Sequence, residues 1–121
     1  MALSLTLKPK EKIFIGGAVV QNGSTKAELT VLNDVPILRQ KEIIHEGEAT
    51  TPCRRIYLAV QQIYLDESNR VTYFKLLTEL LQDVLSAAPS TANLVKEIGS
   101  SVAEGRYYAA LKLTKQLINY E

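Results

Sequence analysis

Residues 51–65 read TPCRRIYLAVQQIYL, and this stretch separates two parts of the chain that differ in pattern. The Thr51 hydroxyl can accept a hydrogen bond from a backbone amide at a helix start. Pro52 suits the first helical position because it has no amide hydrogen to leave unpaired. Apolar residues then recur at helical spacing, at Ile56, Val60, Ile63 and Tyr64. The stretch therefore predicts a helix that begins at Pro52.

Three more helices are expected after this one. Residues 66–69 form a polar break, and the next helix should end before Pro89. Ser90 or Thr91 can cap a third helix, and Gly105 separates it from a fourth. We expect the apolar stripes of these helices to pack as core faces: Phe74, Leu77, Leu81, Val84 and Leu85; then Leu94, Val95, Ile98 and Val102; then Tyr108, Leu111, Leu117 and Ile118.

The residues before Thr51 are typical of short strands. Leu3 to Lys8 alternate apolar and polar side chains, the period of a half-buried strand. Gly16-Gly17 permits a tight turn or a bulge, and Asn22-Gly23 is a strong hairpin signal. Residues 35–38 look like a last strand, in which a proline favours an edge. Up to five short strands predict an antiparallel sheet or a small barrel.

The whole chain is thus expected to be an α+β protein. We expect a β-rich unit at residues 1–48 and a helical unit at 51–121. Residues 40–50, which are rich in charge, are the expected linker between them. The net charge is +1, so nucleic acid would have to bind through a local basic patch. A single cysteine and the lack of a secretory or membrane-spanning pattern favour the cytoplasm.

Catalytic signatures are missing from the sequence. His45 is the one histidine, and no nucleophile-elbow motif or phosphate-binding loop accompanies it. The acidic residues are scattered, without the spacing of a metal site. We therefore expect a binding protein, with no catalytic residue, cofactor or metal ion.

Cys53 has two interpretations. It falls in the first turn of a helix beside Arg54 and Arg55, where exposed amides and cations would favour a reactive thiolate. Alternatively, it is a small buried apolar residue, since free cysteine is among the most buried residue types.

Positive charge gathers in a few places. Lys8, Lys10 and Lys12 would share one face if the first strand continued through them. Arg39 and Lys41 flank the end of the last strand. Arg54 and Arg55 start a helix, where a phosphate could also use free backbone amides. Each group alone is more often a solvated face than a ligand site, and from charge alone a protein partner is favoured over nucleic acid.

Four segments, in order along the chain, resemble the FlbT family of bacterial flagellum biosynthesis regulators. They are MALSLTLKPKEKIFIGGAVVQNG (1–23), NDVPILRQKEI (33–43), TPCRRIYLAVQQIYLD (51–66) and RYYAALKLTKQLINYE (106–121). The resemblance implies a non-catalytic post-transcriptional regulator that acts on the 5′ untranslated region of flagellin mRNA, represses translation and promotes decay. A partner protein, FlaF, usually works alongside. The rival interpretation is an adaptor or chaperone that binds flagellin or a flagellar partner through the helical half.

Residues 5–16 and 35–43 also resemble, more weakly, the CsrA/RsmA family of translational repressors. In that family an arginine at the place of Arg39 contacts RNA. The first strand there carries basic residues in succession, whereas Leu7 precedes Lys8 here. We therefore name as candidate RNA-binding residues Arg39 and Lys41, then Lys8 and Lys10, then Arg54 and Arg55.

Overall fold

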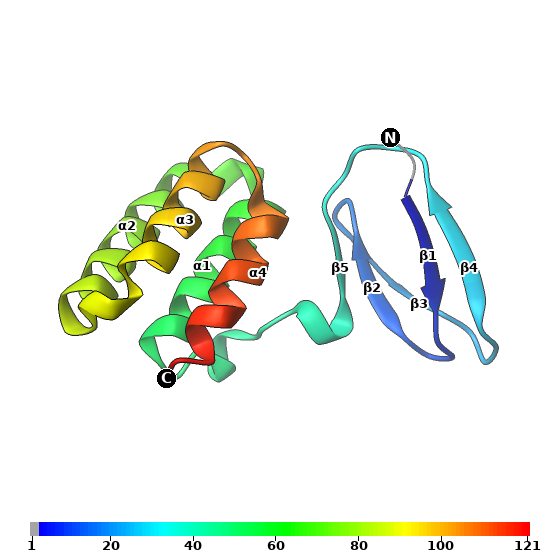
Figure 1. Cartoon of the computed structure of the whole chain (residues 1–121). Coiled ribbons are helices and arrows are strands. Elements are labelled where there is room, and N and C mark those ends of the chain that lie inside the picture. Colours follow the sequence, from blue (N-terminus) through cyan, green and yellow to red (C-terminus); the bar gives the residue numbers. More distant parts are fainter. Residues whose placement is uncertain (1–2) are drawn as a thin grey trace. The chain divides into compact units, whose positions relative to one another are not determined.

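The computed structural model describes residues 3–121, and this part of the chain divides into two compact units between residues 43 and 44. We call the described part of the first, residues 3–43, the β-unit and the second the helical unit. The β-unit holds strands in two small antiparallel sheets, and the helical unit holds four α-helices (Figure 1). The predicted α+β class is confirmed.

The β-unit contains five short strands. β1 pairs with β4 in one sheet, and β2 lies between β3 and β5 in the other. β5 is therefore an edge strand, as Pro36 before it predicted. The strands are β1 (Leu3–Leu7), β2 (Lys12–Ile15), β3 (Ala18–Gln21), β4 (Ala27–Val31) and β5 (Ile37–Arg39).

The two glycine-containing turns of the β-unit differ from each other. Gly16 and Gly17 have φ of +53° and +97° and connect β2 to β3 as a two-residue hairpin, so the predicted tight turn is confirmed. The hairpin predicted at Asn22-Gly23 is wrong, because β3 pairs with β2 whereas β4 pairs with β1. Asn22 instead ties two loops together, since its Nδ2 donates to the carbonyl oxygens of Lys8 (2.8 Å) and Thr25 (2.9 Å).

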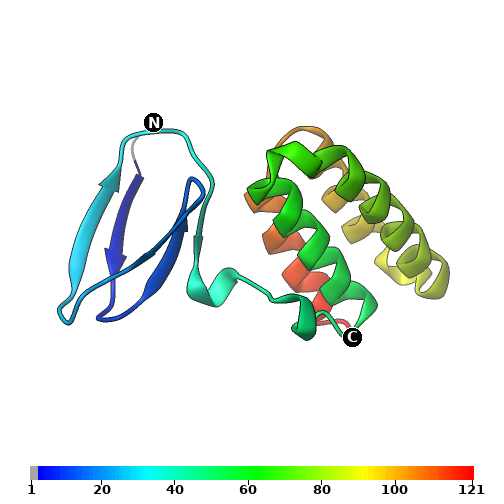
Figure 2. The ribbon, with the colours of Figure 1, turned by 180° about the vertical axis from the view of Figure 1, so that it is seen from behind.

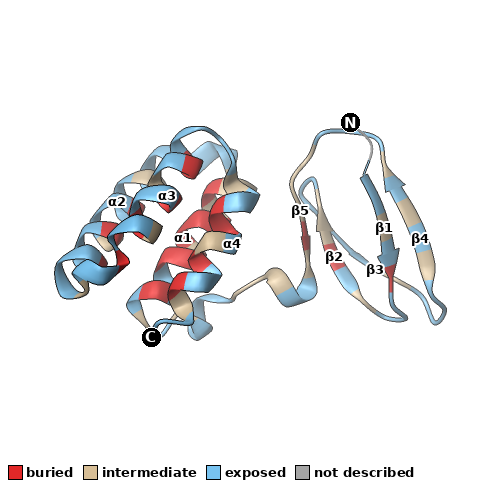
Figure 3. Ribbon diagram, viewed as in Figure 1, coloured by how far each residue is buried: buried red, intermediate tan, exposed pale blue. Residues whose placement is uncertain are grey.

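The buried apolar core of the β-unit is small. Leu7, Ile13 and Leu38 are almost completely buried, and they come from β1, β2 and β5. β3 is exposed along its whole length, and Val19 retains 74% of its accessible surface (Figure 3). The fully buried part of this core therefore comes from β1, β2 and β5 alone among the described strands.

The helical unit comprises α1 (Pro52–Leu65), α2 (Arg70–Ala87), α3 (Ala92–Ala103) and α4 (Tyr107–Ile118). Short 3₁₀ turns lie at Gln40–Glu42, Glu46–Glu48, Glu67–Asn69 and Pro89–Thr91, the first of them in the β-unit. The predicted cap of α1 is confirmed, because the Thr51 Oγ1 accepts a hydrogen bond from the amide of Arg54 (3.2 Å). Gly105, whose φ is +78°, lies between α3 and α4 and separates the two helices as predicted. The amides of Gly105 and Arg106 bond back to the carbonyls of Val102 and Ser101, which is a Schellman motif.

α1 is the central helix of the helical unit. It packs against α2 on one side and α4 on the other, while α3 packs chiefly on α4 (Figure 2). Half of its positions are buried: Cys53, Ile56, Tyr57, Ala59, Val60, Gln61 and Ile63.

Most of the predicted core positions in the other helices are buried, but five are not. Phe74, Leu94 and Ile118 are only half-buried, and Leu85 and Tyr108 each retain 39% of their surface. The buried positions of α4 are Ala110, Leu111, Thr114 and Leu117, so Tyr108 lies toward the opposite side of that helix. The expectation that Tyr108 is a core residue is therefore wrong.

A side-chain clamp fixes the start of the helical unit. The Gln61 Oε1 accepts a hydrogen bond from the amide of Ile44 (2.8 Å), and its Nε2 donates to the carbonyl oxygen of Ile44 (3.0 Å). One amide side chain thus satisfies both backbone groups of one residue, as a neighbouring strand would. The clamp holds the segment before α1 against that helix.

Candidate nucleic-acid interface

The strand register brings all six lysines and arginines of residues 3–43 to one end of the β-unit. Lys12 opens β2 opposite Gln21, and Arg39 closes β5 opposite Ile13. Leu7, the last residue of β1, lies opposite Ala27, so Lys26 precedes β4 at this same end. We call this end, with its loops, the basic end. Its cations are Lys8, Lys10, Lys12, Lys26, Arg39 and Lys41.

The shared strand face proposed for Lys8, Lys10 and Lys12 does not form. β1 ends at Leu7 and β2 begins at Lys12, so the intervening residues form a turn. Lys10 adopts a positive φ of 64°, and its amide bonds to the carbonyl of Gly23 (2.8 Å). The turn still brings the three lysines to one end, by a different route from a continuous strand.

Arg39 is engaged inside the β-unit. Its Nη1 donates to the carbonyl oxygen of Thr6 (2.9 Å) and lies 3.5 Å from the Glu11 Oε2. Its side chain is 27% exposed. A hydrogen bond from the amide of Lys8 and the nearby Arg39 guanidinium lower the pKa of Glu11. Arg39 therefore connects β5 to β1, and it supports the basic end rather than extending from it.

The five lysines of the basic end are its exposed cations. Of the ion pairs found among residues 3–121, the one in this unit joins Arg39 to Glu11. Two of the four acidic residues of the β-unit lie at this end, and both accept backbone hydrogen bonds, Glu11 from Lys8 and Glu42 from Arg39. Long, exposed lysine side chains suit contacts with phosphates.

Arg54 and Arg55 belong to the helical unit, and both are exposed. The amides of this helix start are already occupied. Pro52 has none, the Cys53 amide donates to the Glu121 carboxylate (3.2 Å), and the Arg54 amide donates to Thr51. The start of α1 therefore lacks the free amides expected for a phosphate, because the Glu121 side chain and Thr51 accept their hydrogen bonds.

Cys53 is a buried thiol. It is 5% exposed, and burial together with the neighbouring Glu121 carboxylate raises its pKa from 9.0 to about 11. Both effects favour the protonated thiol. Of the two interpretations, the structure supports the small buried residue and contradicts the reactive thiolate.

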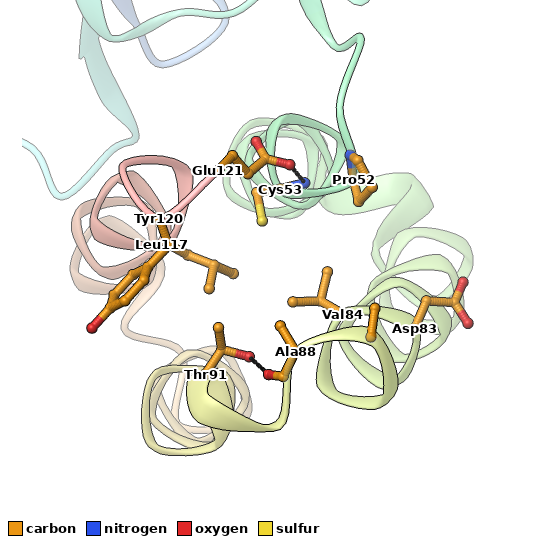
Figure 4. Close-up of a pocket in the computed structure, with 10 residues that line it drawn as sticks. Pro52, Cys53, Asp83, Val84, Ala88, Thr91, Leu117, Tyr120 and Glu121 are labelled. Carbon is orange, nitrogen blue, oxygen red and sulfur yellow. Dashed lines mark hydrogen bonds between the residues drawn. The ribbon is translucent and has the colours of Figure 1, made fainter.

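An apolar pocket of about 410 Å³ lies beside Cys53, where the ends of the four helices meet (Figure 4). Leu117 and Val84 point into it, and the Thr91 hydroxyl is turned to the carbonyl of Ala88 (2.7 Å). Its charged lining residues are the acids Asp83 and Glu121, with no lysine or arginine. This chemistry disfavours a phosphate ligand in the pocket.

The structure also locates the single histidine and bears on metal binding and membrane spanning. His45 is exposed, and residues 3–121 contain no group of three His, Cys, Asp or Glu side chains placed to hold a metal ion. Within the same residues, no helix has the length and apolar character to cross a bilayer.

Sequence reasoning missed two sets of basic residues. Lys26 joins the basic end only through the pairing of Leu7 with Ala27, which the sequence does not reveal. On α4, Lys112 and Lys115 each lie over a tyrosine ring. The signal for that second set was available, because the sequence of α4 contains lysines and tyrosines but no acidic residue.

The amino-acid sequence is similar to known proteins over nearly its whole length. The family model of the flagellar protein FlbT matches residues 3–121. A probable flagellum biosynthesis repressor protein FlbT of Caulobacter sp. (strain K31) is 39% identical, across 100% of this chain and 94% of the relative. A second, from Bradyrhizobium diazoefficiens, is 37% identical across 100% of this chain and 83% of the relative.

A third relative, the flagellum biosynthesis repressor protein FlbT of Caulobacter vibrioides (strain ATCC 19089), is 37% identical across 100% of this chain and 87% of its own length. No solved structure matches the chain significantly. The family match over nearly the whole chain and the identity of 37–39% to these relatives lead to one conclusion. The chain belongs to the FlbT family of flagellar proteins.

Proposed function

We propose that this chain is a non-catalytic, post-transcriptional repressor of flagellin synthesis that binds the 5′ untranslated leader of flagellin mRNA. The relatives' names support repression of flagellum biosynthesis. The observation that carries RNA binding is the basic end, where every lysine and arginine of the β-unit gathers. The flagellin leader as the target is what the family resemblance implies.

The basic end suits a single-stranded leader better than a duplex with a defined sequence. Exposed lysines neutralise phosphates without demanding one geometry, whereas sequence-specific RNA recognition usually needs unstacked bases. A bound leader would block ribosome entry and leave the message open to nucleases. This mechanism requires no catalytic group in the protein.

Matched charge removal tests the proposal. Lys10→Gln/Lys26→Gln removes two exposed cations from the basic end, and Lys75→Gln/Lys96→Gln removes two exposed cations from α2 and α3. The affinity for the flagellin leader is measured by fluorescence anisotropy at several salt concentrations. For the first pair, the slope of log affinity against log salt should be smaller by about 1–2 than for the unmodified chain. The second pair should behave like the unmodified chain. Equal slopes for the two pairs would contradict an RNA interface at the basic end.

A second candidate is an adaptor that binds flagellin or the partner protein FlaF. The apolar pocket at the end of the helical unit favours it, because an apolar pocket suits a bulky side chain from a protein. Such binding should depend little on salt. If flagellin binds tightly and the leader does not, the adaptor function is correct.

A further inference from the structure

The exposed side of α4 is both basic and aromatic. Tyr108, Lys112 and Lys115 follow at i, i+4 and i+7, which places them on one side of the helix, and all three are exposed. The sequence of α4 contains no Asp or Glu to offset the two lysines. We call these three residues the α4 stripe.

Aromatic rings position both lysines of the stripe. The Lys112 Nζ lies 5.2 Å from the centre of the Tyr108 ring. The Lys115 Nζ lies 6.0 Å from the ring of Tyr57, a buried residue of α1, the helix that packs against α4 (Figure 1). Cation–π contacts restrict flexible side chains while leaving the charge able to meet an anion.

Two arginines near the α4 stripe each have a partner of a different kind from those of the stripe lysines. Arg106 pairs with Glu104 at 2.7 Å. Arg70 donates to the carbonyl of Ile63 (2.7 Å) and lies 4.9 Å from the Tyr107 ring. The two arginines at this end of α4 thus have structural partners. The ion pairs found among residues 3–121 do not include either lysine of the stripe.

We propose that the α4 stripe is a second RNA-binding surface, which takes a single-stranded segment of the transcript. The inference rests on the proposed function and extends it to the helical unit. Lys112 and Lys115 would contact successive phosphates, and the Tyr108 ring would stack on an unpaired base. A duplex keeps its bases stacked on one another, so the combination of ring and cations selects single strands.

Paired variants test the lysines. Lys112→Gln/Lys115→Gln should reduce the slope of log affinity against log salt for the flagellin leader by about 1–2, since single strands give about 0.7 for each phosphate contact. Lys75→Gln/Lys96→Gln, with the same change in net charge, should leave the slope unchanged. Thermal unfolding of each variant shows whether the helical unit stays folded. An equal slope for both folded variants overturns the inference.

Tyr108 has its own matched pair. Tyr108→Ala should weaken leader binding about 5- to 100-fold through loss of stacking, whereas Tyr108→Phe keeps a ring and should bind within about twofold. A fully paired RNA of the same sequence should bind all variants alike. If Tyr108→Ala binds as Tyr108→Phe does, the ring does not stack on RNA and the inference is wrong.

The outcomes separate the two proposals. If the unmodified chain does not bind the leader, both proposals fail. If it binds, and only the basic-end variant Lys10→Gln/Lys26→Gln weakens binding, the α4 stripe alone is refuted. If the α4 variants lose a protein partner and keep full affinity for RNA, the stripe is a protein-docking surface and this inference is again overturned.

Discussion

Replacing Gln61 with leucine tests the clamp at the start of the helical unit. Gln61 is 3% exposed, and its amide holds both the amide and the carbonyl of Ile44. Gln61→Leu fills a similar volume but leaves the Ile44 amide and carbonyl without their hydrogen-bond partner. An unsatisfied buried polar group costs about 1–3 kcal/mol. Ile44 is only half-buried, so water offsets part of the loss, and we expect a decrease of about 2–4 kcal/mol in unfolding free energy.

Chemical denaturation followed by circular dichroism measures this effect. Gln116→Leu makes the same chemical change at an exposed position of α4, and it should alter the unfolding free energy by less than about 0.5 kcal/mol. If the two variants unfold at the same denaturant concentration, Gln61 does not support the fold as described.

Gln61→Glu adds a test that depends on pH. A carboxylate would still accept from the Ile44 amide but would repel its carbonyl, whereas a protonated carboxyl can donate to that carbonyl. The pKa of the introduced group should therefore lie above its unfolded value of about 4.3. Its stability contribution is then fully present below that value and is lost as pH rises through the folded pKa. A variant whose stability did not fall between about pH 4 and pH 7 would refute this reasoning.

Other predictions follow from single contacts. Because the pKa of Cys53 is raised from 9.0 to about 11, iodoacetamide should modify it on the order of 100-fold more slowly at pH 8 than in the unfolded chain, as mass spectrometry can show. The thiol ionises at lower pH in the unfolded chain, so the free energy of unfolding should fall as pH rises from about 9 to about 11. Glu121→Gln removes one cause of the raised Cys53 pKa, so the pH range of this fall should become narrower. Arg39→Ala should lower the unfolding midpoint as well as leader affinity, and an unchanged midpoint would contradict its structural contacts. Thr51→Ala should cost about 1 kcal/mol and Leu77→Ala about 2–5 kcal/mol on denaturation, and the opposite order would contradict the placement of α1 and α2.

Local chemistry explains why the helices could be predicted from sequence. Thr51 and Pro52 act within one turn of α1, and Gly105 acts within the turn that ends α3. Such signals need only neighbouring residues. Periodicity gave the core faces less accurately. Tyr108 has an apolar ring but lies on the side of α4 away from its buried positions.

The β-unit shows where sequence reasoning failed. Asn22-Gly23 favours a hairpin locally, but β4 pairs with β1, and the paired residues of these two strands are 20 to 28 positions apart in the sequence. Arg39 looked like an exposed cation at a strand end. Its partner Thr6 lies 33 positions earlier, and only the folded arrangement of β1 and β5 brings them together. The candidate cations were therefore mostly found, but their roles depended on nonlocal pairing.

The salt dependence of leader binding by the unmodified chain tests the central claim most directly. Affinity for the single-stranded flagellin leader is measured by anisotropy from about 50 to about 200 mM KCl. If about four to six lysines contact phosphates, log affinity should fall linearly with log salt, with a slope of about −3 to −4. Binding that is absent at low salt, or that does not change across this range, would contradict an RNA-binding repressor.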